Sequence, residues 1–162
     1  MLRPIRMDDL RRAPQQTIEL DFRQFIDQFE SLAPVEGRVQ LTHGGTFLSV
    51  TGAVSTIITL ACHRCLQQFN HRLYLEFDEI LVIEEPVQDP LPVELEIDSE
   101  DLAERIAPHG TFDVGDWVYQ NLHLNLPVQM ACRSDCAGVV VDPNLHSPQG
   151  DPRWAALKSF NL

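Results

Sequence analysis

Residues 46–65 read TFLSVTGAVSTIITLACHRC, and this stretch decides the fold because strand-forming sequence runs directly into a cysteine pair. The segments 46–54 and 56–61 are rich in β-branched residues, so we expect each to form a strand. Cys62 and Cys65 follow at once, which places the pair at a corner between strands. Alternation of apolar and polar residues resumes after it and predicts a long strand over residues 70–83.

Further strands are predicted upstream of this stretch. Residues 17–22 read TIELDF, an alternation that turns Ile18, Leu20 and Phe22 to one face. Residues 37–42 form another candidate strand, which is joined to the next through His43-Gly44-Gly45. Glycine adopts the positive φ that a tight hairpin requires, so we expect this pair to be antiparallel.

Helical patterns complete the predicted fold. We expect one helix over residues 23–32, which Pro34 ends. A second is expected over 99–106, with Ser99 as its cap, and a third begins at Asp113 and ends before Pro127. Asp151-Pro152 predicts the start of a short terminal helix. The fold class is therefore α+β, an antiparallel sheet with a few packed helices, because no strand–helix–strand rhythm is present. We predict a flexible N-terminal arm over residues 1–16, one α+β domain over 17–138, and a C-terminal strap with a docking helix over 139–162.

The only cysteines in the chain form two short-range pairs, Cys62/Cys65 and Cys132/Cys136. Four thiolates are the ligand set of a tetrahedral structural zinc ion, so we predict a zinc knuckle that joins the middle of the chain to its C-terminal third. The separation between the pairs exceeds that of compact zinc ribbons, and two unrelated pairs of reduced thiols remain an alternative. Disulfide or redox chemistry is disfavoured, because a strand rather than a thiol-activating helix is predicted after Cys65.

Charge is unevenly distributed along the chain. The net charge is −12, and twelve acidic residues lie between Glu76 and Glu104, where Lys and Arg are absent. Such a face can simply keep a protein soluble, or it can attract a basic partner. For the second alternative, the candidate partner-binding acids are Glu84, Glu85, Glu94 and Glu96.

Nucleic-acid binding by the isolated domain is disfavoured, because tracking a phosphate backbone requires a Lys/Arg face. Only Arg64 and Arg72 lie near the first cysteine pair, where they could make a local phosphate contact. A basic protein partner is therefore expected rather than naked RNA.

Catalysis, export and membrane insertion find no support in the sequence. The six histidines form no HxxxH or HExxH pattern, and GxSxG, P-loop and GxGxxG motifs are absent. We therefore expect a protein that is not an enzyme and that has no small-molecule substrate. No apolar run approaches the length of a membrane span, and the first ten residues do not resemble a signal peptide. We expect a cytoplasmic protein with no membrane partner, since its cysteines suit a reducing compartment.

Several motifs in order resemble the YceD family, the large ribosomal RNA subunit accumulation proteins. They are the Cys-x-Arg-Cys-Leu string at residues 62–66, the Asp101-Leu102 helix start, the Leu126-Pro127 helix end, Cys132-x3-Cys136-x-Gly138, and the DPRWAAL ending at 151–157. The resemblance implies a non-catalytic role in the accumulation of large-subunit ribosomal RNA, with a large-subunit precursor as partner. A zinc-stapled interaction module unrelated to ribosomes is the alternative.

The chain departs from the family pattern at one place. Many members carry further cysteines soon after the second pair, whereas this chain has Val139-Val140-Val141-Asp142. Four cysteine ligands are therefore the most that this chain offers to a metal.

Overall fold

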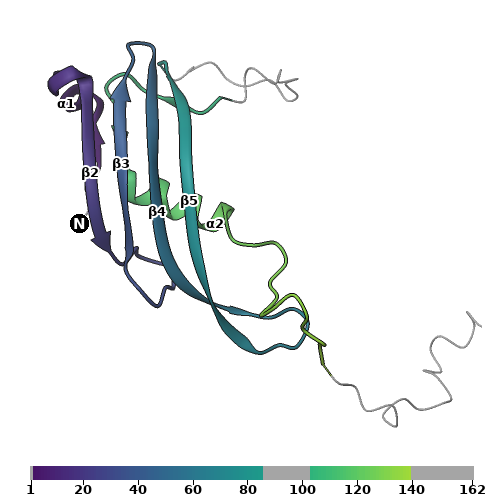
Figure 1. Cartoon of the computed structure of the whole chain (residues 1–162). Coiled ribbons are helices and arrows are strands. Elements are labelled where there is room, and N and C mark those ends of the chain that lie inside the picture. The colour runs from purple at the N-terminus through teal and green to yellow at the C-terminus, as the bar shows by residue number, and fades with distance from the viewer. Residues whose placement is uncertain (1, 86–102, 140–162) are drawn as a thin grey trace, which may run out of the picture. The chain divides into compact units, whose positions relative to one another are not determined.

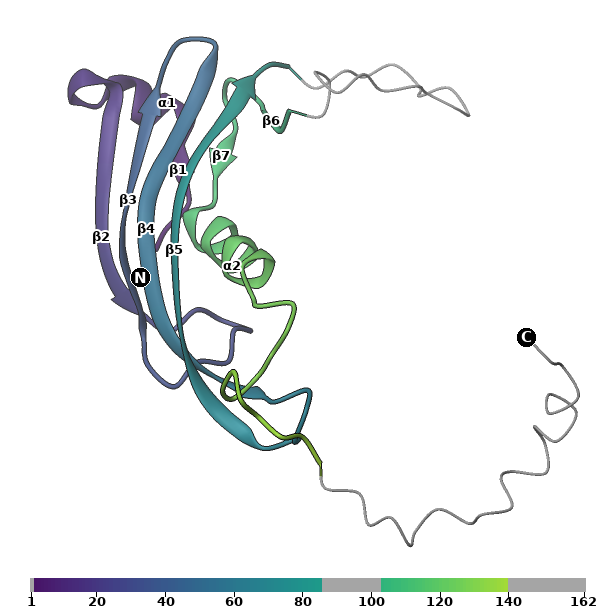
Figure 2. The ribbon, with the colours of Figure 1, turned by 45° about the vertical axis from the view of Figure 1, so that its right-hand side comes forward.

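A computed structural model describes residues 2–85 and 103–139 (Figures 1 and 2). The chain divides into two compact units. Unit 1 comprises Met1–Leu60 and Asn70–Val128, and unit 2 comprises Ala61–Phe69 and Gln129–Leu162. The described elements, in chain order, are β1 (Ile5–Arg6), α1 (Met7–Arg12), the 3-10 helix η1 (Pro14–Gln16), β2 (Thr17–Gln24), β3 (Val35–His43), β4 (Phe47–Ala61), β5 (Gln68–Ile83), β6 (Arg105–Ile106), β7 (Thr111–Phe112) and α2 (Val114–Leu124).

A five-stranded sheet in the order β2-β3-β4-β5-β6 is the larger of two sheets in the described chain, and β1 pairs with β7 in a two-stranded sheet. β2 pairs with β3 and β3 with β4 in antiparallel register, for example Leu20 with Val39 and Val39 with Gly52. The predicted class, a mostly antiparallel sheet with packed helices, is confirmed. One pairing differs, because the two residues of β6 run parallel to the end of β5.

The turn between β3 and β4 forms as the glycines predict. The backbone N–H of Gly44 donates to the carbonyl of Phe47 at 2.8 Å, and Gly45 has a φ of +89°. Gly52 is required for a different reason, because a Cβ there would collide with the backbone of Arg38 on β3. β4 continues through Ser55 without a break, so the two strands predicted over residues 46–61 are one.

α2 covers one face of the sheet, as Figure 2 shows, and its sequence explains its position. Asp113 caps the helix by accepting a hydrogen bond from the N–H of Asp116 at 3.0 Å, so the predicted start is confirmed. The Trp117 ring packs edge-on against Phe77 of β5 with ring centroids 4.4 Å apart, and its indole N–H donates to Glu79 at 3.0 Å. Val118 and Leu122 are fully buried, which makes this stripe part of the core.

The predicted helix over residues 23–32 does not form. β2 runs on to Gln24, which pairs with Val35, and the segment beyond it folds as turns. Of the four apolar residues that gave the helical spacing, Ile26 and Phe29 are buried, whereas Phe25 and Leu32 are 59% and 58% exposed. The prediction was wrong because this loop is tied to β4 instead: the N–H of Leu32 donates to Ile57 at 2.7 Å.

Two further segments differ from expectation. Residues 1–16 were predicted to be a flexible arm, but they contain β1 and α1, and Met7 and Leu10 of α1 are fully buried. The predicted helix over 99–106 ends as strand β6, because Val82 and Glu84 donate backbone hydrogen bonds to Glu104 and Ile106. Residues 99–102 and the predicted C-terminal helix lie outside the described residues.

Candidate metal centre

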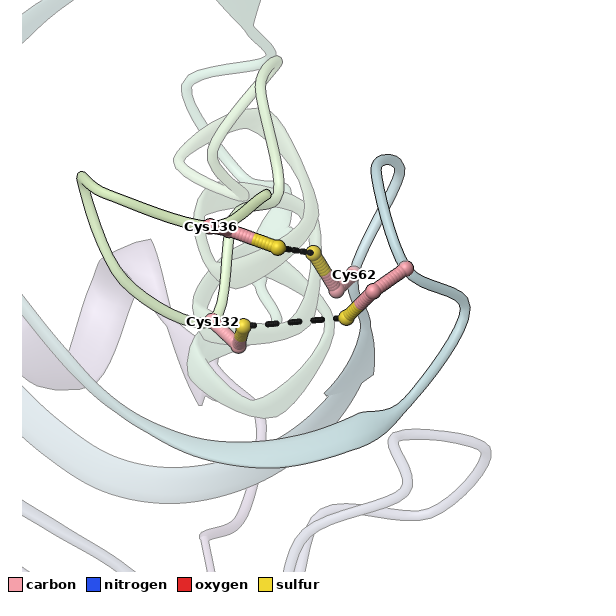
Figure 3. A group of neighbouring side chains, drawn as sticks. Cys62, Cys132 and Cys136 are labelled. Atoms are coloured by element: carbon pink, nitrogen blue, oxygen red, sulfur yellow. Dashed lines mark hydrogen bonds between the residues drawn. The ribbon is translucent and has the colours of Figure 1, made fainter. Parts of the chain in front are cut away.

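Unit 2 brings all four cysteines together, as the sequence predicts (Figure 3). Their sulfur atoms all lie within 4.8 Å of one another. The Sγ atoms of Cys62 and Cys136 are 3.8 Å apart, and so are those of Cys65 and Cys132. Each cysteine of the first pair therefore faces one cysteine of the second.

The distances fit a metal tetrahedron and not a disulfide. Four sulfur atoms at about 2.3 Å from a central zinc ion lie about 3.8 Å from one another. A disulfide requires an S–S separation of about 2.05 Å, and all four thiols are free. The four side chains thus form a candidate metal site in which the protein supplies every ligand.

Backbone hydrogen bonds shape the loop that carries the first pair. The N–H of Cys62 donates to Gln67 and the N–H of Leu66 donates to Cys62, both at 2.9 Å. This closed turn sets Leu66 at a φ of +64°, in the left-handed region. A leucine pays about 1–2 kcal/mol for that conformation, which glycine adopts freely.

Two hydrogen bonds join this loop to the loop of the second pair. The N–H of His63 donates to the carbonyl of Met130 at 2.7 Å, and the guanidinium of Arg64 donates to the carbonyl of Ser134 at 3.1 Å. Gly138, with a φ of +80°, passes so close to Arg64 that an added Cβ would lie 3.4 Å from its carbonyl oxygen. Arg64 therefore joins the loops of the two cysteine pairs within unit 2.

Within the cluster the pKa of Cys62 is lowered, whereas those of Cys65 and Cys132 are raised. Hydrogen bonds from the backbone of Cys132 and then of Cys65 lower the pKa of Cys62 to about 6. Burial raises the pKa of Cys132 to about 12, and the adjacent thiols of Cys136, Cys65 and Cys62 act in the same direction. The backbone of Gln67 lowers the pKa of Cys65, but burial and the thiols of Cys62 and Cys136 outweigh it, so the net shift is upward. A bound cation would compensate the clustered charge of four thiolates.

The predicted partner-binding residues that the structure describes belong to two different units. Arg64 belongs to unit 2, whereas Arg72 is an exposed residue of β5 in unit 1. Glu84 and Glu85 are exposed at the end of β5, and Glu84 forms an ion pair with Arg105 at 3.1 Å. Glu94 and Glu96 lie outside the described residues. Glu84, a member of the acidic stretch, is thus paired with Arg105, a basic residue that lies just outside that stretch in the sequence.

Comparison with known proteins places the chain in a family. The sequence profile described as "Large ribosomal RNA subunit accumulation protein YceD" matches residues 50–161, more than half of the chain. The chain belongs to the YceD family. The matched residues include all four cysteines of the candidate metal centre.

Individual relatives share between a quarter and a third of their aligned residues with this chain. An uncharacterized protein of Mycobacterium bovis and one of Mycobacterium tuberculosis are each 29% identical over 140 residues, which cover 82% of this chain and 63% of the relative. A protein of Arabidopsis thaliana, named large ribosomal RNA subunit accumulation protein YCED homolog 1, chloroplastic, is 25% identical over 126 residues, or 65% of this chain and 39% of that protein. The chain thus spans less than two thirds of the length of these relatives. No solved structure matches it.

Proposed function

We propose that this protein is a non-catalytic ribosome biogenesis factor that supports the accumulation of large-subunit ribosomal RNA. The observation that carries the proposal is the family match over residues 50–161, since the family is named for that role. The Arabidopsis relative bears the same name. The acidic composition supports an action through a protein of the assembling subunit, because a chain of net charge −12 repels phosphate and attracts basic proteins.

The cofactor of the proposal is one structural zinc ion held by Cys62, Cys65, Cys132 and Cys136. Zinc is the ion that four-thiolate tetrahedral sites of this kind select in structural modules. The same geometry supports a role without catalysis, because a catalytic zinc keeps one position open for water or substrate. Here four protein sulfur atoms fill the coordination sphere.

The partner of the proposal is a precursor of the large ribosomal subunit, contacted through one of its basic proteins. Glu84 and Glu85 are exposed and belong to the stretch of twelve acids. Glu94 and Glu96 extend the proposed contact in the sequence. Opposite charges accelerate the encounter of two proteins, and salt weakens the effect. Arg72, exposed on β5, is proposed to add at most a local phosphate contact.

The proposed compartment is the cytoplasm. The four thiols are free, which suits a reducing compartment. No helix among residues 2–85 and 103–139 is long and apolar enough to cross a membrane.

Depletion of the protein in its native host tests the function. We expect sucrose gradients to show fewer large subunits relative to small ones, with a parallel fall in the ratio of large-subunit to small-subunit ribosomal RNA. A plasmid copy of the wild-type gene serves as the control and should restore both ratios. Unchanged ratios after complete depletion, or co-purification with a complex that contains no ribosomal precursor, would reject the proposal in favour of a general interaction module.

A further inference from the structure

Leu66 occupies a backbone position that does not favour leucine. Its φ is +64°, and its N–H closes the turn on the carbonyl of Cys62 at 2.9 Å. Glycine adopts this conformation without steric cost. Among the described residues, the other non-glycine positions with positive φ are Gln15, Gln16 and Gln28, so Leu66 is the apolar member of the group. The geometry of the turn therefore does not explain the leucine.

Burial does not explain it either. The Leu66 side chain is 72% exposed, whereas Cys62, at the other end of the same turn, is completely buried. A side chain that stays in water gains little from the hydrophobic effect within its own chain. Neither the turn nor the core formed by residues 2–85 and 103–139 benefits from the leucine, so its apolar surface is available to another molecule.

The sequence around Leu66 has the composition of the centre of a protein interface. Asp and Glu are absent from the sequence between Glu36 and Glu76, although the chain as a whole is strongly acidic. The neighbours Gln67 and Gln68 are exposed and uncharged. The guanidinium of Arg64 is held by Ser134 within unit 2. An apolar group whose sequence neighbours carry no carboxylate fits the centre of a protein interface, where charged residues are depleted.

We propose that Leu66 is an anchor that inserts into an apolar pocket on a protein of the assembling large subunit; this rests on the proposed function. A protein is the fitting partner, because single-stranded RNA is bound by stacking its bases on aromatic or arginine side chains and not on an aliphatic one. The acidic remainder of the chain steers the encounter with a basic protein, and Leu66 then supplies the buried contact.

The first test is the substitution Leu66→Gly in the full chain. It removes the anchor and relieves the backbone, so the zinc content should be unchanged and the thermal midpoint unchanged or higher. Co-sedimentation with large-subunit precursors should fall by at least tenfold. The control is Leu124→Ala, which removes an aliphatic side chain that is 82% exposed at the end of α2, outside the acidic stretch, and should leave co-sedimentation unchanged.

Three outcomes of this test would overturn the inference. Loss of zinc in Leu66→Gly would assign the leucine to the fold of the knuckle. Unchanged co-sedimentation would remove its role in binding, and an equal loss in Leu124→Ala would show that exposed apolar area in general is responsible. Failure of the proposed function gives a different result, since depletion itself would then leave the ribosomal RNA ratio unchanged.

The second test identifies the partner. A photocrosslinking amino acid is placed at position 66 of the chain in its native host, and at position 124 as the control. A crosslink from position 66 to a large-subunit ribosomal or assembly protein, not formed from position 124, is expected. Crosslinks to ribosomal RNA, crosslinks to a second copy of this chain, or the absence of crosslinks at position 66 would contradict the inference.

Discussion

Unit 1 and unit 2 are held together by different interactions. All the buried apolar side chains of the described chain belong to unit 1, with Cys62 as the exception. In the described part of unit 2, residues 61–69 and 129–139, Cys62 is the only buried residue. A segment with so little apolar burial requires another source of free energy to stay folded, as small metal-binding modules do. The comparison indicates that hydrophobic burial stabilises the sheet, and it supports the proposal that metal ligation stabilises the knuckle.

The largest expected effect is the loss of metal on Cys132→Ser. Removing one of four ligands from the cluster should abolish stoichiometric zinc binding, because three thiolates and a hydroxyl form a much weaker site. Native mass spectrometry of the purified protein measures the bound metal. The sheet of unit 1 should keep its circular dichroism spectrum. Arg133→Ala is the control, since the exposed side chain of this neighbour forms an ion pair with Asp135 at 3.3 Å and is not a ligand, so the variant should retain one zinc ion. Full zinc occupancy in Cys132→Ser would contradict the ligand assignment.

The complementary experiment lowers the stability of unit 1 and leaves the metal content of unit 2 unchanged. Leu122→Ala removes a fully buried side chain of α2, and we expect a loss of about 2–5 kcal/mol in the free energy of unfolding. Urea denaturation measures this loss, and the variant should still carry zinc. Leu124→Ala, on the same helix but 82% exposed, should cost less than about 0.5 kcal/mol. Equal costs for the two variants would show that α2 does not pack as described.

A smaller effect is expected at the start of α2. Asp113→Ala removes the side chain that accepts the N–H of Asp116, and it should reduce stability by about 1 kcal/mol. Asp113→Asn keeps an accepting oxygen and should recover most of the loss. Thermal unfolding of both variants beside the wild type provides the measurement. Identical midpoints for the alanine variant and the wild type would show that the cap contributes nothing.

The smallest effect concerns an exposed ion pair between β2 and β3. The Arg38 guanidinium donates to Asp21 at 2.7 Å and lowers the pKa of that carboxyl below its usual range. Because the folded-state pKa is lowered, the stabilisation is present above the unfolded pKa and is lost as the pH falls through the folded one. In Arg38→Ala, an NMR titration should place the pKa of Asp21 closer to 3.8. An unchanged pKa would contradict the pairing, and solvent screening keeps the effect on stability small.

The elements that could be predicted from sequence are those with one clear pattern. Alternation in residues 17–22 and 70–83 identified β2 and β5, and the capping residue Asp113 marked the start of α2. The cysteine spacing identified all four members of the candidate metal centre. In each of these cases the local pattern and the tertiary packing favour the same structure.

The failures have tertiary causes. Residues 23–32 have helical apolar spacing, but strand pairing of Gln24 with Val35 and the backbone bond from Leu32 to Ile57 override it. α1 was missed because only Met7 and Leu10 form its apolar side, although Asp8 and Asp9 in its first turn and Arg11 and Arg12 in its last fit the helix dipole. The roles of Arg64 and Leu66 depend on a turn and a cross-loop contact. The sequence marked both residues as part of the Cys-x-Arg-Cys-Leu string, but it did not show the hydrogen bond of Arg64 to Ser134 or the positive φ of Leu66.

Hydrogen–deuterium exchange of the whole protein, with zinc and after its removal by a chelator, tests the two sources of stability most directly. The account predicts that the amides of His63, Leu66 and Cys136, which are hydrogen-bonded in unit 2, lose protection when the metal is removed. Amides of β3 in unit 1, such as that of Val39, should keep theirs. Equal loss of protection in both units, or unchanged protection in unit 2, would contradict the claim that the metal holds the knuckle and burial holds the sheet.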